Sequence, residues 1–339
     1  MAALVAATAL LASLFLPFAV KPWLVRRGVL DVPTARSSHT EPTIRGMGIT
    51  VAAALLLSMA VAWLALLLGP QEEAAGPAVV LVSALVMAAA AVIGWIEDFR
   101  GIAIKFRAVL QLGIGLAGSL ALAAALPGQN VWWVPAGAVA VAAYINVANF
   151  MDGINGISGM HGLLVGLFYA AAGLLTGHLW LVLAGAGIAA AFAGFLPWNL
   201  SRGNVFLGDV GSYLLGASIA VTAVAAFLAK VPVEYIFSPV LIYLADTFIT
   251  LIRRIASGQR WYAAHRQHAY QRLTIVGLSH LQATAVVSAA TVATGLLGIV
   301  STRAGEGMDI LAGVLCALVV LLYLRTPTIF QRMIRRRAV

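Results

Sequence analysis

A stripe of amide and carboxylate side chains lies at the end of one of the apolar runs of this chain. Asn146, Asn149 and Asp152 follow one another at intervals of three residues, and Asn155 and Gly156 continue the segment. Residues three apart are neighbours on a helix, so these oxygens would lie along one side of it. A helix C-cap would explain one Asn and one Gly, but not four polar groups at this spacing. The pattern therefore indicates a binding or catalytic site.

A further acid, Asp209, lies between Gly208 and Gly211 at the start of another apolar run. A carboxylate there can cap the helix or hold a hard cation beside phosphate oxygens, and alone it does not decide between them. Together with the stripe at Asn149 and Asp152, it favours a metal. Because Mg²⁺ takes one or two carboxylates and completes its shell with phosphates and water, we predict Mg²⁺, with Mn²⁺ as the alternative ion.

Three other acids lie at or inside apolar runs. Glu97 and Asp98 end the third run, where negative charge opposes the helix dipole and is therefore mildly unexpected. Asp246 lies inside the ninth run, about two turns before Arg253 and Arg254. An acid within a membrane span is costly, so Asp246 is either functional or paired with a nearby arginine.

Two loops alternate basic side chains with turn residues. The first loop has Arg36, His39 and Arg45, and the long loop near the C-terminus has His265, Arg266 and His268. Guanidinium and imidazole groups suit phosphate, whereas a zinc site would need further ligands that are not nearby. We predict phosphate or diphosphate contacts for both sets.

The elements that must position these residues are membrane spans. The 339 residues are 62% hydrophobic and 10% charged, against about 25% charged in soluble domains. A spanning helix needs about 20 apolar residues, and eleven segments qualify. We predict an all-α polytopic protein forming one integral membrane domain over 1–339, with spans near 3–24, 47–69, 77–96, 108–126, 131–148, 160–176, 178–197, 210–229, 234–252, 281–301 and 309–325.

Basic residues predict the orientation. When sides alternate along these spans, all of the 21 Lys and Arg residues except Lys230 and Arg303 fall on one side. By the positive-inside rule that side is cytoplasmic, so the N-terminus is outside and the C-terminus inside. The candidate residues lie in the cytoplasmic loops 25–46, 97–107, 146–159, 199–211 and 253–280.

The composition also excludes some kinds of binding partner and site. The net charge of +9 comes from short loops rather than from a basic stripe with aromatics, so nucleic acid is not expected. The single cysteine, Cys316, excludes a disulfide within the chain and a cysteine metal site. The first run lacks a preceding basic region and a cleavage site, and we interpret it as a span rather than a signal peptide.

Five ordered motifs resemble those of the polyprenyl-phosphate N-acetylhexosamine-1-phosphate transferases. They cover almost the whole chain, each on the predicted cytoplasmic side. The motifs are Asp31-x-Pro33-x-x-Arg36-x-x-His39-x-x-Pro42 through Gly46-x-Gly48, Gly94-x-x-Glu97-Asp98, Asn146-x-x-Asn149-x-x-Asp152-Gly153-x-Asn155-Gly156, Val205-Phe-Leu-Gly208-Asp209-Val-Gly211-Ser212 and His265-Arg266-x-His268.

The resemblance implies transfer of a sugar-1-phosphate from a UDP-N-acetylhexosamine to undecaprenyl phosphate in a bacterial inner membrane, with Mg²⁺ bound and UMP released. It implies Asp209 and Asn149 as metal ligands, Asp98 as the group that orients or deprotonates the acceptor, and Asp152 as a residue near the nucleotide or behind the metal. The resemblance further implies that substrate-binding residues are Arg36, His39, Arg45, Glu97, Asn146, Asn155, His265, Arg266 and His268. Oligomeric state is open, with a homodimer as one option.

Two departures from the family pattern bear on the roles of single residues, and the spacing of the histidines bears on the branch. Glu97 stands where many members have a second Asp, and Asn155 stands where many bacterial members have Asp. The spaced His265 and His268 resemble the branch that initiates O-antigen or other surface polysaccharides, whereas the peptidoglycan branch has consecutive histidines. The alternatives are a phospho-N-acetylmuramoyl-pentapeptide transferase and, in another class, a transporter or lipid-binding scaffold.

Overall fold

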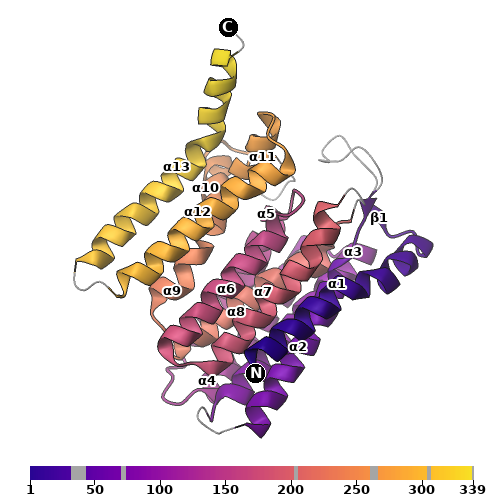
Figure 1. The fold of residues 1–339 in the computed structure, drawn as a ribbon, viewed down its shortest axis with the longest axis vertical. Helices are drawn as coiled ribbons and strands as arrows, with labels where there is room; N and C mark the ends of the chain where they lie inside the picture. Colours follow the sequence, from indigo (N-terminus) through magenta and orange to yellow (C-terminus); the bar gives the residue numbers. More distant parts are fainter. Residues whose placement is uncertain (32–42, 70–73, 202–204, 260–265, 304–306, 338–339) are drawn as a thin grey trace.

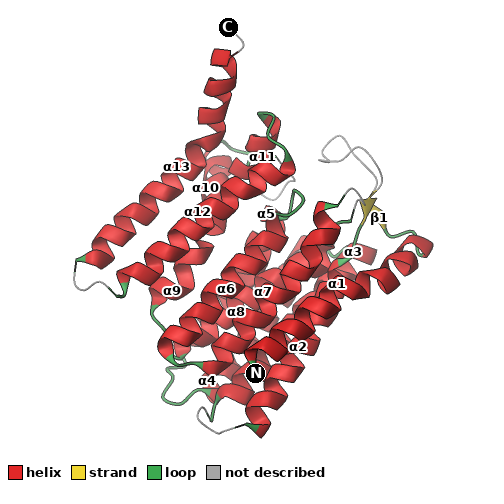
Figure 2. Cartoon of the chain, viewed as in Figure 1, coloured by secondary structure: helices red, strands yellow, loops and turns green. Residues whose placement is uncertain are grey.

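The structure is a computed structural model that describes residues 1–31, 43–69, 74–201, 205–259, 266–303 and 307–337. Helices dominate this part of the chain, and eleven of its helical segments are long and apolar enough to span a membrane (Figures 1 and 2). The first eight are α1 (Ala2–Arg26), α2 (Gly48–Leu68), α3 (Gly76–Arg100), α4 (Ile104–Ala125), α5 (Trp133–Met151), α6 (Ile157–Thr176), α7 (Leu179–Leu200) and α8 (Gly208–Leu228). The predicted all-α membrane fold is confirmed.

The first eight spans form one bundle around α8. The α8 helix is the most buried span and packs against α2, α3, α4, α5, α6 and α7. By contrast, α1 and α4 leave long apolar side chains exposed on the outside, among them Phe15, Phe18 and Val109. Exposed apolar side chains are expected where lipid replaces water as the solvent, so the exposed face of the bundle is the face toward the bilayer.

The ninth span is broken rather than continuous. It consists of α9 (Val233–Phe237), the 3₁₀ turn η1 (Ser238–Val240) and α10 (Leu241–Ala256). Pro239 lies in the turn, and proline interrupts a helix because it lacks a backbone N–H and crowds the preceding turn. The predicted span over 234–252 is therefore correct in position but contains a break.

The remaining helices form a second group beside the bundle (Figure 1). They are α11 (Ala269–Ile275), α12 (His280–Ser301) and α13 (Met308–Arg337). The α13 helix packs on α10, α11 and α12 and continues past its predicted end at residue 325. The start of α1 and the end of α13 lie toward opposite ends of the molecule in Figure 1, as an odd number of spans requires. Which end faces the cytoplasm stays a prediction.

Candidate active site

A small backbone assembly brings the first loop to the start of α8. The strands β1 (Leu30–Asp31) and β2 (Thr43–Ile44) pair antiparallel, and Ile44 forms a parallel bridge with Val205. Backbone bonds continue from Phe206 N to Ile44 O at 2.8 Å and from Gly48 N to Leu207 O at 2.8 Å. Arg45, between these contacts, is therefore held beside Asp209 although 164 residues separate them in sequence.

Asp98, on α3, caps the N-terminus of α8 from outside that helix. Its two carboxylate oxygens accept hydrogen bonds from the backbone N–H groups of Asp209, at 3.0 Å, and Val210, at 2.9 Å. These N–H groups have no partner inside their own helix, and a carboxylate satisfies both their hydrogen bonding and the helix dipole. The side chain of Asp98 is 0% exposed. Asp98 thus fixes the backbone position of Asp209.

Because Asp98 supplies the cap, the Asp209 side chain is free to face the loop. Arg45 joins the two acids, with Nε 2.7 Å from Asp98 Oδ1 and Nη2 2.6 Å from Asp209 Oδ2. Asn149 donates from Nδ2 to Asp209 Oδ1 at 2.6 Å and to Ser212 Oγ at 3.1 Å. Of the two interpretations of Asp209, capping and ligand binding, the structure excludes capping by its carboxylate.

Close helix contacts make this arrangement possible. A Cβ on Gly94 of α3 would collide with the backbone of Asp209, so only glycine lets α3 approach α8 here. Gly208 has φ of +74°, and a Cβ there would lie 2.7 Å from both Asp98 Oδ2 and Gly46 N. L-residues with a side chain rarely adopt this conformation, so glycine is required on two grounds. Both glycines belong to motifs identified from the sequence.

Asp152 lies in the loop between α5 and α6, next to the Asn149 end of the site. Ser158 donates its hydroxyl to Asp152 Oδ1 at 2.7 Å. Burial, as the largest cause, raises the pKa of Asp152 to about 7, and the negative charges of Asp209 and Asp98 add to the shift. Since burial disfavours the charged form of a carboxyl group, Asp152 changes charge near neutral pH.

The polar side chains of the predicted stripe at the end of α5 contact different parts of the protein. Asn149 reaches Asp209, whereas Asn146 donates to Gln111 Oε1 on α4 at 2.6 Å and to its own helix at Ala142 O. Asn155 contacts the start of α12, where Thr284 Oγ1 donates to Asn155 O at 3.1 Å. We call the cluster of Asp98, Asp209 and Arg45 the acidic centre. Of the three amides, only Asn149 contacts it.

Glu97 bonds to the turn after α3 and not to Asp98 or Asp209. Its carboxylate accepts the backbone N–H of Ile102 at 2.6 Å and lies 3.2 Å from Arg107 Nη1. These contacts fold the turn between α3 and α4 and neutralise the charge of Glu97. The structure therefore places Glu97 in a supporting position, and its predicted contact with substrate stays a prediction.

The start of α11 lies against the end of α5. Tyr270 donates its hydroxyl to Phe150 O at 2.9 Å, and a Cβ on Gly153 would collide with that hydroxyl. His268 is buried beside Asp246, with Nδ1 3.4 Å from Asp246 Oδ1, while Arg266 is partly exposed. Of the predicted basic residues, Arg45 and Arg266 are therefore accessible, and Arg36, His39 and His265 lie outside the described residues.

Several residues of the site were not predicted. Gln111 and Asn199 are polar residues in apolar runs, a signal that sequence inspection could have used. Asn199 joins two loops, since it accepts from Gly156 N and donates to Val205 O at 2.9 Å. Ser158, His280 and Tyr270 carry no such signal, because their roles depend on contacts between distant segments.

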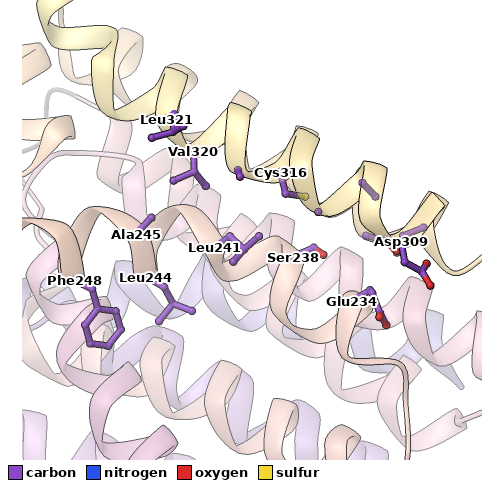
Figure 3. Close-up of a pocket in the computed structure, with 15 residues that line it drawn as sticks. Glu234, Ser238, Leu241, Leu244, Ala245, Phe248, Asp309, Cys316, Val320 and Leu321 are labelled. Carbon is purple, nitrogen blue, oxygen red and sulfur yellow. The ribbon is translucent and has the colours of Figure 1, made fainter. Parts of the chain in front are cut away.

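A separate cavity of about 690 Å³ lies between the ninth span and α13 (Figure 3). Apolar side chains line most of it, and the carboxylates of Glu234 and Asp309 lie at one end. None of the predicted site residues lines this cavity. In the described part of the chain, no group of three His, Cys, Asp or Glu side chains is arranged to hold a metal by protein ligands alone.

Fold and site together define a polytopic membrane protein with an arginine-bridged pair of carboxylates at one end of its helix bundle. Residues 78–227, which span α3 to α8, match the model of glycosyl transferase family 4. The matched segment contains Asp98, Asn149, Asp152 and Asp209. The resemblance found in the sequence motifs is confirmed.

Named relatives agree with this assignment. The chain is 28% identical over 336 residues to the decaprenyl-phosphate N-acetylglucosaminephosphotransferase of Mycolicibacterium smegmatis, covering 84% of this chain and 78% of the relative. It is 27% identical to the probable undecaprenyl-phosphate N-acetylglucosaminyl 1-phosphate transferase of Bacillus subtilis, covering 79% and 76%. A phospho-N-acetylmuramoyl-pentapeptide-transferase of Clostridium botulinum is 28% identical over 176 residues, covering 51% and 52%.

Proposed function

We propose that the protein transfers an N-acetylhexosamine-1-phosphate from a UDP-sugar to undecaprenyl phosphate and releases UMP. The observation that carries the proposal is the cluster of Asp98, Arg45, Asp209 and Asn149, in which two acids share one guanidinium at the end of the bundle. Such a centre suits a reaction in which phosphate charge must be neutralised. The printed activities of the relatives from M. smegmatis and B. subtilis support the same reaction.

The donor atoms fit a hard divalent cation. Carboxylate oxygens on Asp98 and Asp209 lie on either side of the Arg45 guanidinium, which is itself a cation held by both. Mg²⁺ needs only one or two protein carboxylates when substrate phosphates complete its shell. We assign Asp209 and Asn149 to this ion, with Mn²⁺ as a substitute; Asn149 would bind through Oδ1 once its amide, whose Nδ2 faces Asp209 in this structure, is turned over. When bound, the metal would stabilise the charge that develops on the diphosphate.

The protein residues have distinct roles in this proposal. Undecaprenyl phosphate carries about −1.5 to −2 charges near neutral pH, so its attacking oxygen needs positioning more than deprotonation. That oxygen bonds to the β-phosphorus of the donor, and the bond from the β-phosphorus to the UMP oxygen breaks. Arg45, 36% exposed, can exchange a carboxylate for a phosphate oxygen. Asp98 holds Asp209 in place through the α8 cap, and Asp152 lies on the nucleotide side.

The site would act at the cytoplasmic face of a bacterial inner membrane. The proposed orientation puts the N-terminus outside and the C-terminus inside, which places the basic loops and the acidic centre on the same side. A UDP-sugar from the cytosol and a phosphate at the leaflet surface can meet there. We further propose that the product begins a surface polysaccharide such as O-antigen, since the histidines in the long loop are spaced rather than consecutive.

A donor panel tests the function. Purified protein is incubated with Mg²⁺, undecaprenyl phosphate and each of UDP-N-acetylglucosamine, UDP-N-acetylgalactosamine, UDP-N-acetylfucosamine, UDP-N-acetylquinovosamine and the muramoyl-pentapeptide nucleotide, and UMP is measured. We expect UMP from at least one of the four hexosamine donors, and none after chelation of the metal. Release from the muramoyl nucleotide alone would support the peptidoglycan transferase instead. Donor or lipid binding by folded protein without any UMP would support the transporter or scaffold.

A further inference from the structure

One buried acid takes no part in the chemistry proposed above. Asp246 lies on α10 and is 0% exposed. A carboxylate in such a place is costly unless its oxygens are fully engaged. Its carboxylate accepts from Tyr323 on α13 at 2.6 Å and from the backbone N–H of Ala269 at 2.8 Å, with weaker contacts to Tyr270 N and Thr250 Oγ1. The arginine pairing considered from the sequence is not among these contacts.

These contacts join three helices that are distant in sequence. Ala269 and Tyr270 begin α11, so Asp246 supplies the acceptor for the unpaired N–H groups at the start of that helix. Tyr323 belongs to α13, 77 residues further along the chain. The cavity of Figure 3 separates α10 from α13 beyond this point and is lined there by Ala245 and Leu321. Asp246 therefore links α11 and α13 to α10 where packing between α10 and α13 gives way to the cavity.

The same helix lies against the acidic centre. Tyr270 donates to Phe150 O at the end of α5, two residues before Asp152. His268, immediately before α11, is held beside Asp246. The His268 ring also stacks on Phe150, with ring centroids 6.5 Å apart, and Arg266 precedes His268 by two residues. A shift of α11 would therefore move Arg266 relative to the loop that contains Asp152 and Asn155.

We propose that Asp246 is a positioning residue for the nucleotide-sugar donor, because its bonds to α11 and Tyr323 hold α11, and the segment that leads into it from Arg266, against the end of α5. This inference rests on the proposed function in naming the donor as the ligand. It assigns His268 to the same anchor, since its ring is buried against Asp246 rather than presented to a ligand. Neither Asp246 nor Tyr323 touches the reacting atoms; both act through the position of α11.

Two substitutions of the anchor and one control test the proposal. Asp246→Asn keeps the shape but replaces one acceptor oxygen with a donor group that faces backbone N–H groups. Tyr323→Phe removes only the hydroxyl that bonds to Asp246. Asp309→Asn is the control, because Asp309 lies on the same helix as Tyr323 but at the far end of the cavity in Figure 3.

Two kinds of measurement are made on each full-length protein in detergent or nanodiscs. Hydrogen exchange reports the protection of the amides of Ala269 and Tyr270, and steady-state kinetics report KM for donor and acceptor separately. For Asp246→Asn we expect faster exchange in α11 and a donor KM about tenfold higher, with kcat and acceptor KM within about twofold of the parent protein. Tyr323→Phe should change the donor KM in the same direction by about threefold. Asp309→Asn should change neither measurement.

The outcomes separate this inference from the proposed function. Unchanged exchange in α11 of Asp246→Asn would overturn the anchor, as would a fall in kcat with an unaltered donor KM. If no donor releases UMP, exchange still tests the anchor, and binding of UDP tests the position of Arg266 without turnover. Faster exchange with about tenfold weaker UDP binding would then support the anchor although the transferase had failed. Equal UDP affinity in all three variants would overturn it.

Discussion

Two acidic centres in this protein are built from the same residue type but differ in how far they are closed to solvent. Asp209 has a side chain that is 15% exposed, and its carboxylate is held by the side chains of Arg45 and Asn149. Asp246 is 0% exposed, and its carboxylate is held by two backbone N–H groups, a tyrosine, a threonine and a histidine. The first centre lies in the bundle of α3, α5 and α8, and the second among α10, α11 and α13.

The difference lies in which partners can be exchanged. A guanidinium at the surface can leave one anion for another at low cost, because water and phosphate oxygens compensate it. Backbone N–H groups at a helix start cannot leave without unfolding that turn. An acid whose partners can be exchanged is able to bind a ligand. An acid whose partners are fixed stabilises the positions of the helices instead. The predictions below test this contrast between the centre at Asp209 and the centre at Asp246.

Asp209→Asn should have the largest effect on activity and little effect on stability. Loss of the charge that holds the cation and opposes Arg45 should lower kcat by about 10³-fold. Thermal unfolding should change by no more than a few degrees, since Asp98 still caps α8. UMP release and thermal unfolding are measured together, with Asp309→Asn as the control. Full activity in the Asp209 variant would place the chemistry elsewhere.

Asp152 should make activity depend on pH. Its pKa is raised to about 7 by burial, so if the charged form is needed, kcat/KM should fall about tenfold between pH 8 and pH 6. Stability should show the opposite trend. Because the folded pKa lies above the unfolded value of 3.8, the folded state favours the protonated form, and stability declines as pH rises from about 4 to about 7.

Asp152→Asn separates these two effects. The variant lacks the ionisation, so its Tm should exceed that of the parent protein at pH 8 and equal it below pH 4. Its activity should be low at every pH. A parent profile that stays flat from pH 6 to pH 8 would show that ionisation of Asp152 is not needed for turnover.

Arg45→Gln should change the metal requirement more than the fold. Removing the guanidinium leaves Asp98 and Asp209 with uncompensated charge, so the Mg²⁺ concentration for half-maximal activity should fall about fivefold. The rate at saturating Mg²⁺ should fall as well, because a phosphate contact is lost. A titration of UMP release against Mg²⁺ measures both. An unchanged Mg²⁺ dependence would mean that Arg45 and the metal do not compete for the same carboxylates.

Glu97→Asp should have the smallest effect. Glu97 contacts Arg107 and the backbone of Ile102 rather than Asp209, so shortening it disturbs the turn after α3 but not the centre. We expect kcat/KM within about threefold of the parent protein. A loss of kcat/KM as large as that of Asp209→Asn would mean that Glu97 contacts the substrate. Glu97 would then belong to the same centre as Asp209.

The sequence sufficed for the spans and for the identity of the central residues. Long apolar runs are determined by the bilayer thickness, so their number and approximate limits follow from composition alone. Five residues that end or border their spans on the same side were predicted to converge: Glu97, Asp98, Asn149, Asp152 and Asp209. Asp98, Asn149 and Asp209 are joined by hydrogen bonds, whereas Glu97 bonds to Arg107 and Ile102 instead. Both resemblance and spacing pointed to these residues.

The sequence could not supply the division of roles among the acids. That Asp98 caps α8, and so frees the carboxylate of Asp209, depends on a contact across 111 residues. Asp246 was left between a function and an arginine pair, and its partners lie 23 and 77 residues away. Hydrogen bonds between distant segments have no periodicity in the sequence. Pro239, by contrast, could have indicated the break in the ninth span.

The bridge between Ile44 and Val205 has a consequence for comparing relatives by exchanging loops. Residues 44–48 and 205–207 share their backbone hydrogen bonds, so each segment sets the path of the other. A chimera that receives only the first loop of a relative would keep Arg45 on a backbone shaped for a different neighbour. A loop exchange that is meant to keep Arg45 beside Asp209 therefore has to move both segments together.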